Sequence, residues 1–106
     1  MTRKGAKFKF GDVIISEVQF VDTFEVKVRP AVVLFQDYGN VVVAGITSNT
    51  KMRGINLTKK DGMNFESVIK LNYIFTISEM MVKKFLFSVS EEKKKEIKDN
   101  LSSKLK

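Results

Sequence analysis

RPAVVLFQDYGNVVVAGIT, residues 29–47, is the stretch that decides the fold. It holds two apolar runs rich in β-branched residues, AVVLF at 31–35 and VVVAGI at 41–46. Runs of this kind are typical of buried strands. QDYGN between them is a turn sequence, in which Gly39 and Asn40 tolerate positive φ. The pattern predicts a tight hairpin made of two buried strands.

The hairpin is entered through Arg29 and Pro30, and Pro30 is the only proline in the chain. Proline cannot donate to a central ladder but is accepted at the first residue of a strand. It also holds the residue before it in an extended conformation. We therefore expect the strand to begin at Pro30, with Arg29 at its rim. Since the start of one hairpin strand lies near the end of the other, Arg29 is expected close to Thr47 and Ser48.

Arg29 beside these hydroxyl groups has two interpretations. A guanidinium supplies bidentate N–H donors and the hydroxyls supply O–H donors, which together suit a phosphate group. In the structural alternative, Arg29 extends over the sheet edge or pairs with Glu25, and Thr47 and Ser48 are ordinary strand-end residues. The residues by themselves leave both interpretations open.

Further strand patterns lie on both sides of the hairpin. They occupy residues 12–20, 52–57 and 65–77, the last as one strand or two, with a loop within 21–28 and a turn at 58–64. About five short strands in so small a chain predict a mainly β fold, either a strongly bent sheet or a partial barrel.

The C-terminal segment differs in kind, because helix formers dominate residues 90–105. Ser90 is the expected N-cap, and the two glutamates that follow it favour the positive end of the helix dipole. Ile97, Leu101 and Leu105 recur at a spacing of four residues. They predict one narrow apolar stripe that docks the helix on the sheet or on a partner.

The length of 106 residues and the hydrophobic content of 43% fit one domain, with a barrel at about 8–88 and the helix after it. The net charge is +7, with the excess of cations near the two ends of the chain. This charge permits a nucleic-acid partner without requiring one. The apolar runs are too short to span a bilayer, so we expect no membrane association and a cytoplasmic location.

Absent residue types exclude several chemistries. The chain has no histidine and no cysteine, which excludes Ser-His and Cys-His nucleophiles, paired-imidazole ribonucleases and thiolate zinc sites. The phosphate-binding motifs GxGxxG and GxxxxGK[ST] are also absent. The acidic residues are scattered and show no spacing typical of a metal cluster. We expect no metal and no cofactor.

Four segments in order resemble the MazF/PemK family of toxins from type II toxin–antitoxin systems. They are GDV at Gly11–Val13, VRPAVVL at Val28–Leu34, VVVAGITSN at Val41–Asn49 and SVIKLNYIFTI at Ser67–Ile77. A C-terminal helix follows, so the resemblance covers nearly the whole chain. It implies a small SH3-like barrel of the α+β kind with a C-terminal helix, usually a homodimer.

The resemblance also implies an activity and its residues. The family cleaves single-stranded RNA in a sequence-selective reaction that needs no metal, and an acidic cognate antitoxin covers its RNA groove. Arg29 matches the family's catalytic arginine, Thr47 its threonine or serine, and Glu25 is the nearest match for an acidic residue before the arginine. The expected RNA-binding residues are Ser48, Asn49, Lys51, Lys70 and Asn72.

The sequence departs from the family pattern in the later strand. Lys70 and Asn72 stand where some members carry an arginine and an aspartate, and Phe75 replaces a further arginine. Asn72 cannot transfer a proton. Two alternatives therefore stay open: a non-catalytic protein that binds nucleic acid or gyrase, as the related CcdB toxins do, and an interaction module in which Arg29 binds an acidic partner.

Overall fold

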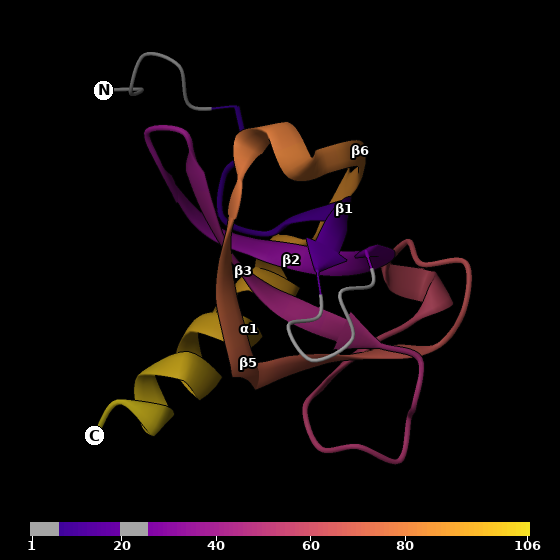
Figure 1. Ribbon diagram of the computed structural model, residues 1–106. Coiled ribbons are helices and arrows are strands. Elements are labelled where there is room, and N and C mark those ends of the chain that lie inside the picture. The colour runs from indigo at the N-terminus through magenta and orange to yellow at the C-terminus, as the bar shows by residue number, and fades with distance from the viewer. Residues whose placement is uncertain (1–6, 20–25) are drawn as a thin grey trace.

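The computed structural model describes residues 7–19 and 26–106. These residues form one curled antiparallel sheet and a C-terminal helix (Figure 1), so the predicted mainly β class is confirmed. The sheet order is β4-β5-β3-β2-β1-β6. The elements are β1 (Asp12–Gln19), β2 (Val26–Asp37), β3 (Asn40–Thr47), β4 (Ile55–Leu57), β5 (Ser67–Ser78), β6 (Val82–Ser88) and α1 (Glu91–Lys104), with short 3-10 turns η1 (Lys59–Asp61) and η2 (Glu79–Met81).

The predicted hairpin is confirmed as β2 and β3, but its turn differs from the expectation. Asp37 pairs with Asn40, so only two residues connect the strands. Positive φ falls on Tyr38, at 57°, and not on Gly39 or Asn40. The Gln36 side chain donates to the Tyr38 carbonyl at 2.7 Å, which stabilises this uncommon conformation.

The second strand begins earlier than predicted. β2 starts at Val26, so residues 26–28 belong to this strand, and Arg29 and Pro30 lie inside it. The rest of the segment in which a loop was expected, 21–25, lies outside the described residues. Pairs with β3 begin only at Ala31, whereas pairs with β1 continue to Val26. The first part of β2 therefore resembles an edge strand, where proline is tolerated.

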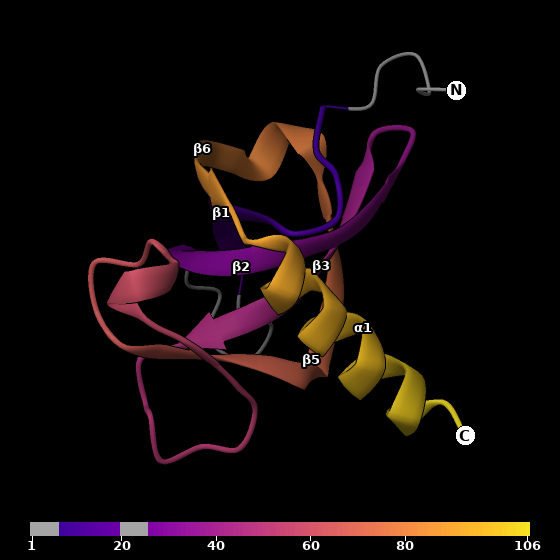
Figure 2. The same ribbon diagram turned by 180° about the vertical axis from the view of Figure 1, so that it is seen from behind.

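The sheet carries a hydrophobic core on each face, because neighbouring residues of a strand point to opposite sides. The helix-side core includes Val13, Val32, Leu34, Ala44, Ile46, Ile69 and Ile97. Figure 2 shows α1 lying across this face. The open-side core consists of Ile14, Ala31, Val33, Val41, Val43 and Ile77, with Phe8, Phe75, Met81 and Val82 packed against it. The open-side core thus lies beneath the face that α1 leaves uncovered.

The helix follows the predicted capping but not the whole predicted stripe. The Ser90 hydroxyl accepts a hydrogen bond from the Lys93 N–H at 3.1 Å, which confirms it as the N-cap. Ile97 is fully buried and Leu101 packs partly against the helix-side core. Leu105 is 79% exposed, so this residue of the predicted stripe does not dock on the sheet. It follows the last residue of α1, Lys104.

The remaining strands also differ in extent from the expectation. The strand expected over 52–57 shortens to β4, and 65–77 forms a single strand, β5. The sequence interpretation did not include β6, whose VKKFLFS pattern lacks a regular alternation and whose residues are partly or largely exposed. No helix of the described residues is long and apolar enough to cross a membrane.

Gly11 of the GDV segment fixes the start of β1. Its N–H donates to the Val33 carbonyl at 2.9 Å, and its own carbonyl accepts from Val89 at 3.0 Å. Its φ is 92°, and a Cβ there would lie 2.8 Å from the Lys94 side chain. Glycine is therefore needed where β1, β2 and the chain before α1 meet.

Candidate functional site

Arg29 of β2 and Thr47 of β3 line the same pocket, just beyond Ala31 and Gly45, the last pair between their strands. The turn alone would place Arg29 opposite Ser48, but a β-bulge between Val33 and Phe35 shifts the register by one residue. Continuing the shifted register brings Arg29 opposite Thr47. Residues directly opposite on antiparallel strands project from the same face. The expected proximity of Arg29 to the hydroxyl cluster therefore has a structural basis.

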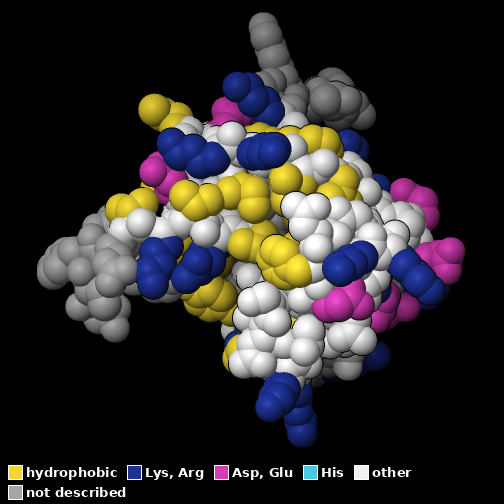
Figure 3. Space-filling view, turned by 90° about the vertical axis from the view of Figure 1, so that its right-hand side faces the viewer, with side chains coloured by type: hydrophobic (Ala, Val, Ile, Leu, Met, Phe, Trp, Pro, Cys, Tyr) yellow, Lys and Arg dark blue, Asp and Glu magenta, His cyan; other side chains and the backbone are white. Residues whose placement is uncertain are grey.

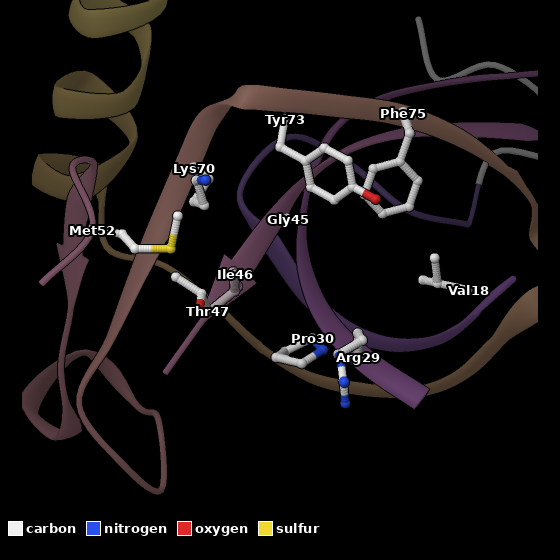
Figure 4. A pocket seen from close by; sticks show the side chains of 10 residues that line it. All are labelled: Val18, Arg29, Pro30, Gly45, Ile46, Thr47, Met52, Lys70, Tyr73 and Phe75. Carbon is white, nitrogen blue, oxygen red and sulfur yellow. The ribbon is translucent and has the colours of Figure 1, made fainter. Parts of the chain in front are cut away.

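Both side chains line one hollow, here called the Arg29 pocket, beside the open-side core. Its volume is about 350 Å³, and it is lined by Val18, Arg29, Pro30, Gly45, Ile46, Thr47, Met52, Lys70, Tyr73 and Phe75 (Figure 4). An adjoining hollow of about 410 Å³ shares four of these residues and adds Val28, Ser48 and Phe65. Pockets of this size accommodate small molecules or one unit of a polymer.

Arg29 stands on one side of the Arg29 pocket, across from the rings of Tyr73 and Phe75 (Figure 4). Its guanidinium is turned away from the rings in this conformation. Arg29 is exposed, and no described carboxylate forms an ion pair with it. Exposed side chains change rotamer within nanoseconds. Its donors are therefore available to a ligand that enters the pocket.

The Thr47 hydroxyl is oriented by the loop that follows β3. It accepts a hydrogen bond from the Asn49 N–H at 3.1 Å, and the Asn49 side-chain oxygen accepts from the Lys51 N–H at 3.1 Å. This chain of turns uses an oxygen lone pair of Thr47 and leaves its O–H proton for donation. Asn49 and Lys51 thus shape the loop, while the Lys51 side chain is exposed outside the pocket lining.

Lys70 joins the Arg29 pocket, but Asn72 does not. Lys70 of β5 pairs with Gly45 of β3. The residue before Gly45, Ala44, pairs with Ile74 of β5. Three residues of β5, 71–73, therefore have no partner of their own in β3, and the strand bends there. Asn72 lines a different hollow, of about 300 Å³, with Arg53, Asn100 and Lys104 among its neighbours. The structure separates these two expected RNA-binding residues.

The sequence interpretation missed Tyr73 and treated Phe75 only as a lost arginine. Their ring centroids lie 5.0 Å apart with an interplanar angle of 40°. A signal for the pair was available, because aromatic residues two apart in a strand point to the same face. Met52 and Val18 were also missed, and nothing in their local sequence marks them as pocket residues.

Carboxylates are scarce around this site. Glu25, the expected acidic residue, lies outside the described residues. None of the described residues that line the Arg29 pocket is acidic. Glu17 lines a neighbouring hollow that Tyr73 also lines, and it forms an ion pair with Lys83 at 3.5 Å. Nowhere in 7–19 and 26–106 do three metal-ligating side chains gather as a metal site.

A further hollow of about 530 Å³ lies beside β6 and shares Pro30 with the Arg29 pocket. Phe65 and Phe85 line it, and each is about half exposed. Figure 3 shows apolar side chains gathered over the middle of the face that carries β6, with Lys and Arg side chains on either side. None of the described residues that line this hollow is acidic.

Comparison with known proteins identifies the family and the fold of this chain. Residues 9–105 match the family described as PemK-like, MazF-like toxin of type II toxin–antitoxin system. A mycobacterial endoribonuclease, solved in complex with its cognate antitoxin, superposes with a TM-score of 0.71 at 15% identity, over 92% of this chain and 91% of its own. The Mycobacterium tuberculosis toxin MazF-mt6 gives a TM-score of 0.66 at 21% identity, over 85% of this chain and 93% of its own.

No match was found among curated proteins. At these identities the two solved structures establish a shared fold, and the match to the family model extends over nearly the whole chain. The chain belongs to the PemK-like, MazF-like toxins of type II toxin–antitoxin systems.

Proposed function

We propose that this chain is a metal-independent, sequence-selective endoribonuclease that cleaves single-stranded RNA. The observation that carries the proposal is that Arg29 and Thr47 line the same pocket, in a chain of a toxin family. Guanidinium and hydroxyl donors together match the oxygens of a phosphodiester. Lys70 in the same lining adds positive charge near that position.

The proposed reaction is a transesterification. The ribose 2′-oxygen attacks the adjacent phosphorus and gives its proton to a base, while the bond from phosphorus to the 5′-oxygen breaks. The products are a 2′,3′-cyclic phosphate and a 5′-hydroxyl, which takes up a proton as it leaves. Negative charge grows on the non-bridging oxygens, and Arg29 stabilises that charge. Arg29 binds the phosphate and does not act as the base, because a guanidinium is not deprotonated in proteins.

Thr47 orients the scissile phosphate by donating its O–H to a non-bridging oxygen. The Asn49 N–H holds the Thr47 oxygen at 3.1 Å, which limits the rotation of the hydroxyl. Ser48 in the adjoining hollow provides a second hydroxyl for a neighbouring group of the RNA. We propose Glu25 as the general base, with Asp22 as the second choice.

The proposal includes partners and a cellular location. An acidic antitoxin would cover the Arg29 pocket, since the net charge of this chain is +7 and one fold relative was solved with its cognate antitoxin. A homodimer is supported by the exposed Phe65 and Phe85 beside β6. The enzyme would act in the cytoplasm, where its mRNA substrates are.

Product chemistry tests the proposal. The purified wild-type chain, incubated with mixed-sequence RNA in EDTA, should yield fragments ending in a 2′,3′-cyclic phosphate and beginning with a 5′-hydroxyl. Arg29→Ala and Thr47→Val should lose cleavage, whereas Thr47→Ser should retain part of it. Arg53→Ala is the matched control, because Arg53 is also exposed but lines a different hollow. Cleavage that EDTA abolishes, or cleavage equal in Arg29→Ala, would refute the mechanism.

A second candidate is a non-catalytic protein that binds nucleic acid or gyrase through the same barrel. The observation in its favour is that no described carboxylate lines the Arg29 pocket and that Asn72 lies in another hollow. RNA bound without cleavage would support a silent binder, and inhibition of DNA supercoiling would support a gyrase inhibitor. Binding of an acidic partner that depends on Arg29, without effects on nucleic acid, would support the interaction module.

A further inference from the structure

The aromatic pair of Tyr73 and Phe75 forms one wall of the Arg29 pocket. Tyr73 is 46% exposed although it is a large aromatic side chain, and its ring tilts 40° against that of Phe75. The rings face Arg29 across the pocket (Figure 4). An exposed ring surface next to cationic side chains suits a ligand that is flat and carries negative charge.

The backbone holds Tyr73 in this position. The unpaired segment 71–73 of β5 turns the ring over Gly45 of β3. A Cβ on Gly45 would lie 2.7 Å from the Tyr73 ring, closer than real Cβ contacts come. Phe75, in turn, packs partly on the open-side core and supports the platform from below. The bend, the glycine and the core contact together keep the ring pair in place before any ligand arrives.

The side chains around the rings limit the class of ligand that fits this pocket. Arg29, Thr47 and Lys70 line the same hollow as the rings, and no described acidic residue does. Single-stranded nucleic acids are bound in just this way, with aromatic rings under the bases and cations along the backbone. The hollow of about 350 Å³ has room for a base beside its phosphate.

We propose that Tyr73 and Phe75 form a stacking platform for one unpaired base of the RNA, next to the phosphate that Arg29 binds. The inference rests on the proposed function for the identity of the ligand as RNA, but not on cleavage. It selects for unpaired RNA, because a base within a duplex cannot present its face to a protein ring.

Binding of RNA that cannot be cleaved separates this inference from catalysis. The probe is a fluorescein-labelled, single-stranded 2′-O-methyl RNA pool of mixed sequence, in which the attacking hydroxyl is blocked. Tyr73→Leu keeps the apolar bulk but removes the ring, and should weaken binding about 5- to 150-fold. Tyr73→Phe keeps the ring and should bind like wild type. Phe35→Leu is the matched control, since Phe35 is 54% exposed outside the pocket lining.

A spectroscopic readout reports stacking itself. The chain has two tyrosines and no tryptophan, so Tyr38→Phe leaves Tyr73 as the only tyrosine emitter. Binding of the 2′-O-methyl pool should quench this emission, and the same pool annealed to its complement should not. A merely structural role of Tyr73 would not produce quenching that depends on strandedness.

The outcomes are distinguishable. Unchanged affinity in Tyr73→Leu, absent quenching, or no binding of the pool by wild type would each overturn the stacking platform. If unmodified RNA is cleaved in those cases, the endoribonuclease proposal stands without the stacking platform. If wild type binds and quenches but leaves unmodified RNA intact, the platform stands and the endoribonuclease proposal fails.

Discussion

Asp12 is a carboxylate with only 2% of its surface exposed, and several groups hold it in place. It accepts hydrogen bonds from the Lys9 N–H at 3.0 Å and the Ser88 hydroxyl at 2.6 Å, and the Lys9 ammonium lies 3.6 Å away. These contacts join the segment before β1 to the end of β6. Within the GDV segment, Asp12 therefore supports the fold and lies outside the lining of the Arg29 pocket.

Asp12→Ala should lower the free energy of unfolding by about 1–3 kcal/mol, because it removes the buried charged acceptor of the Lys9 N–H and of the Ser88 hydroxyl. Urea denaturation monitored by circular dichroism measures this change. Asp99→Ala is the control, since Asp99 forms an exposed pair with Lys95 at 2.8 Å, and exposed pairs contribute about 0–1 kcal/mol. Equal losses in the two variants would contradict the structural role of Asp12.

Gly45→Ala should lower the affinity for RNA and have a smaller effect on the stability of the fold. The added methyl would meet the Tyr73 ring at 2.7 Å, and the half-exposed ring can turn away only by leaving its place in the pocket. The affinity for the 2′-O-methyl RNA pool and the thermal midpoint test the two effects separately. Gly39→Ala is the matched control, because nothing lies within 4 Å of a Cβ there. Equal affinity in the two variants would refute the positioning role of Gly45.

At the scale of residues, the sequence predicts which side chains lie close together but not which residues stand directly opposite each other in the sheet. Arg29 was expected near both Thr47 and Ser48, and the bulge between Val33 and Phe35 decides for Thr47. A bulge depends on contacts across the whole sheet and leaves no mark in an apolar run such as AVVLF. The spacing of Tyr73 and Phe75 indicated a shared face, but the bend at 71–73 beside Gly45 becomes visible only when β3 lies beside β5.

At the scale of elements, α1 is attached to the sheet mainly through its middle. Ile97 is fully buried in the helix-side core, whereas Leu105 lies past the last turn and is 79% exposed. The period of four residues was read correctly from the sequence. Where the helix ends is decided by the local backbone, which an apolar spacing does not reveal.

Ile97→Ala should lower the free energy of unfolding by about 2–5 kcal/mol, because it leaves a cavity between α1 and the sheet. Leu105→Ala truncates a similar apolar side chain that is already exposed to solvent. It should change the free energy of unfolding by less than about 0.5 kcal/mol. Urea denaturation of both variants makes the comparison. A large loss in Leu105→Ala would mean that this side chain is covered, for example by a second copy of the chain.

β6 shows why edge elements are hard to predict. Its burial pattern has no fully buried position, and two adjacent lysines interrupt its apolar residues. Charged residues are common on edge strands because they discourage pairing with other chains. The central strands, in contrast, are buried on both faces and were predicted from continuous apolar runs.

At the scale of the whole molecule, the order of segments proved more informative than any single motif. The family resemblance that they imply is confirmed over residues 9–105, and so is the curled β fold. Composition permitted a polyanionic partner through the net charge of +7 but could not locate its site. The site follows from the fold, which places Lys70 beside Arg29 and turns Asn72 elsewhere.

The net charge leads to a prediction about salt. The logarithm of the RNA affinity should fall linearly with the logarithm of the salt concentration, by about 0.7 per phosphate neutralised on a single strand. Arg29→Ala should make this slope shallower by about 0.7, because one phosphate contact is lost. Lys95→Ala is the control, since Lys95 lies on α1 and pairs with Asp99. An unchanged slope in Arg29→Ala would show that Arg29 does not bind a phosphate.

The central claim is that Arg29 stabilises the charge that develops during RNA cleavage. The most direct test is the single-turnover rate at saturating enzyme, which separates the chemical step from binding. We predict that Arg29→Ala lowers this rate at least about 100-fold, while Arg53→Ala stays near the wild-type rate. Equal rates for Arg29→Ala and wild type, or no cleavage by the wild type, would contradict the claim.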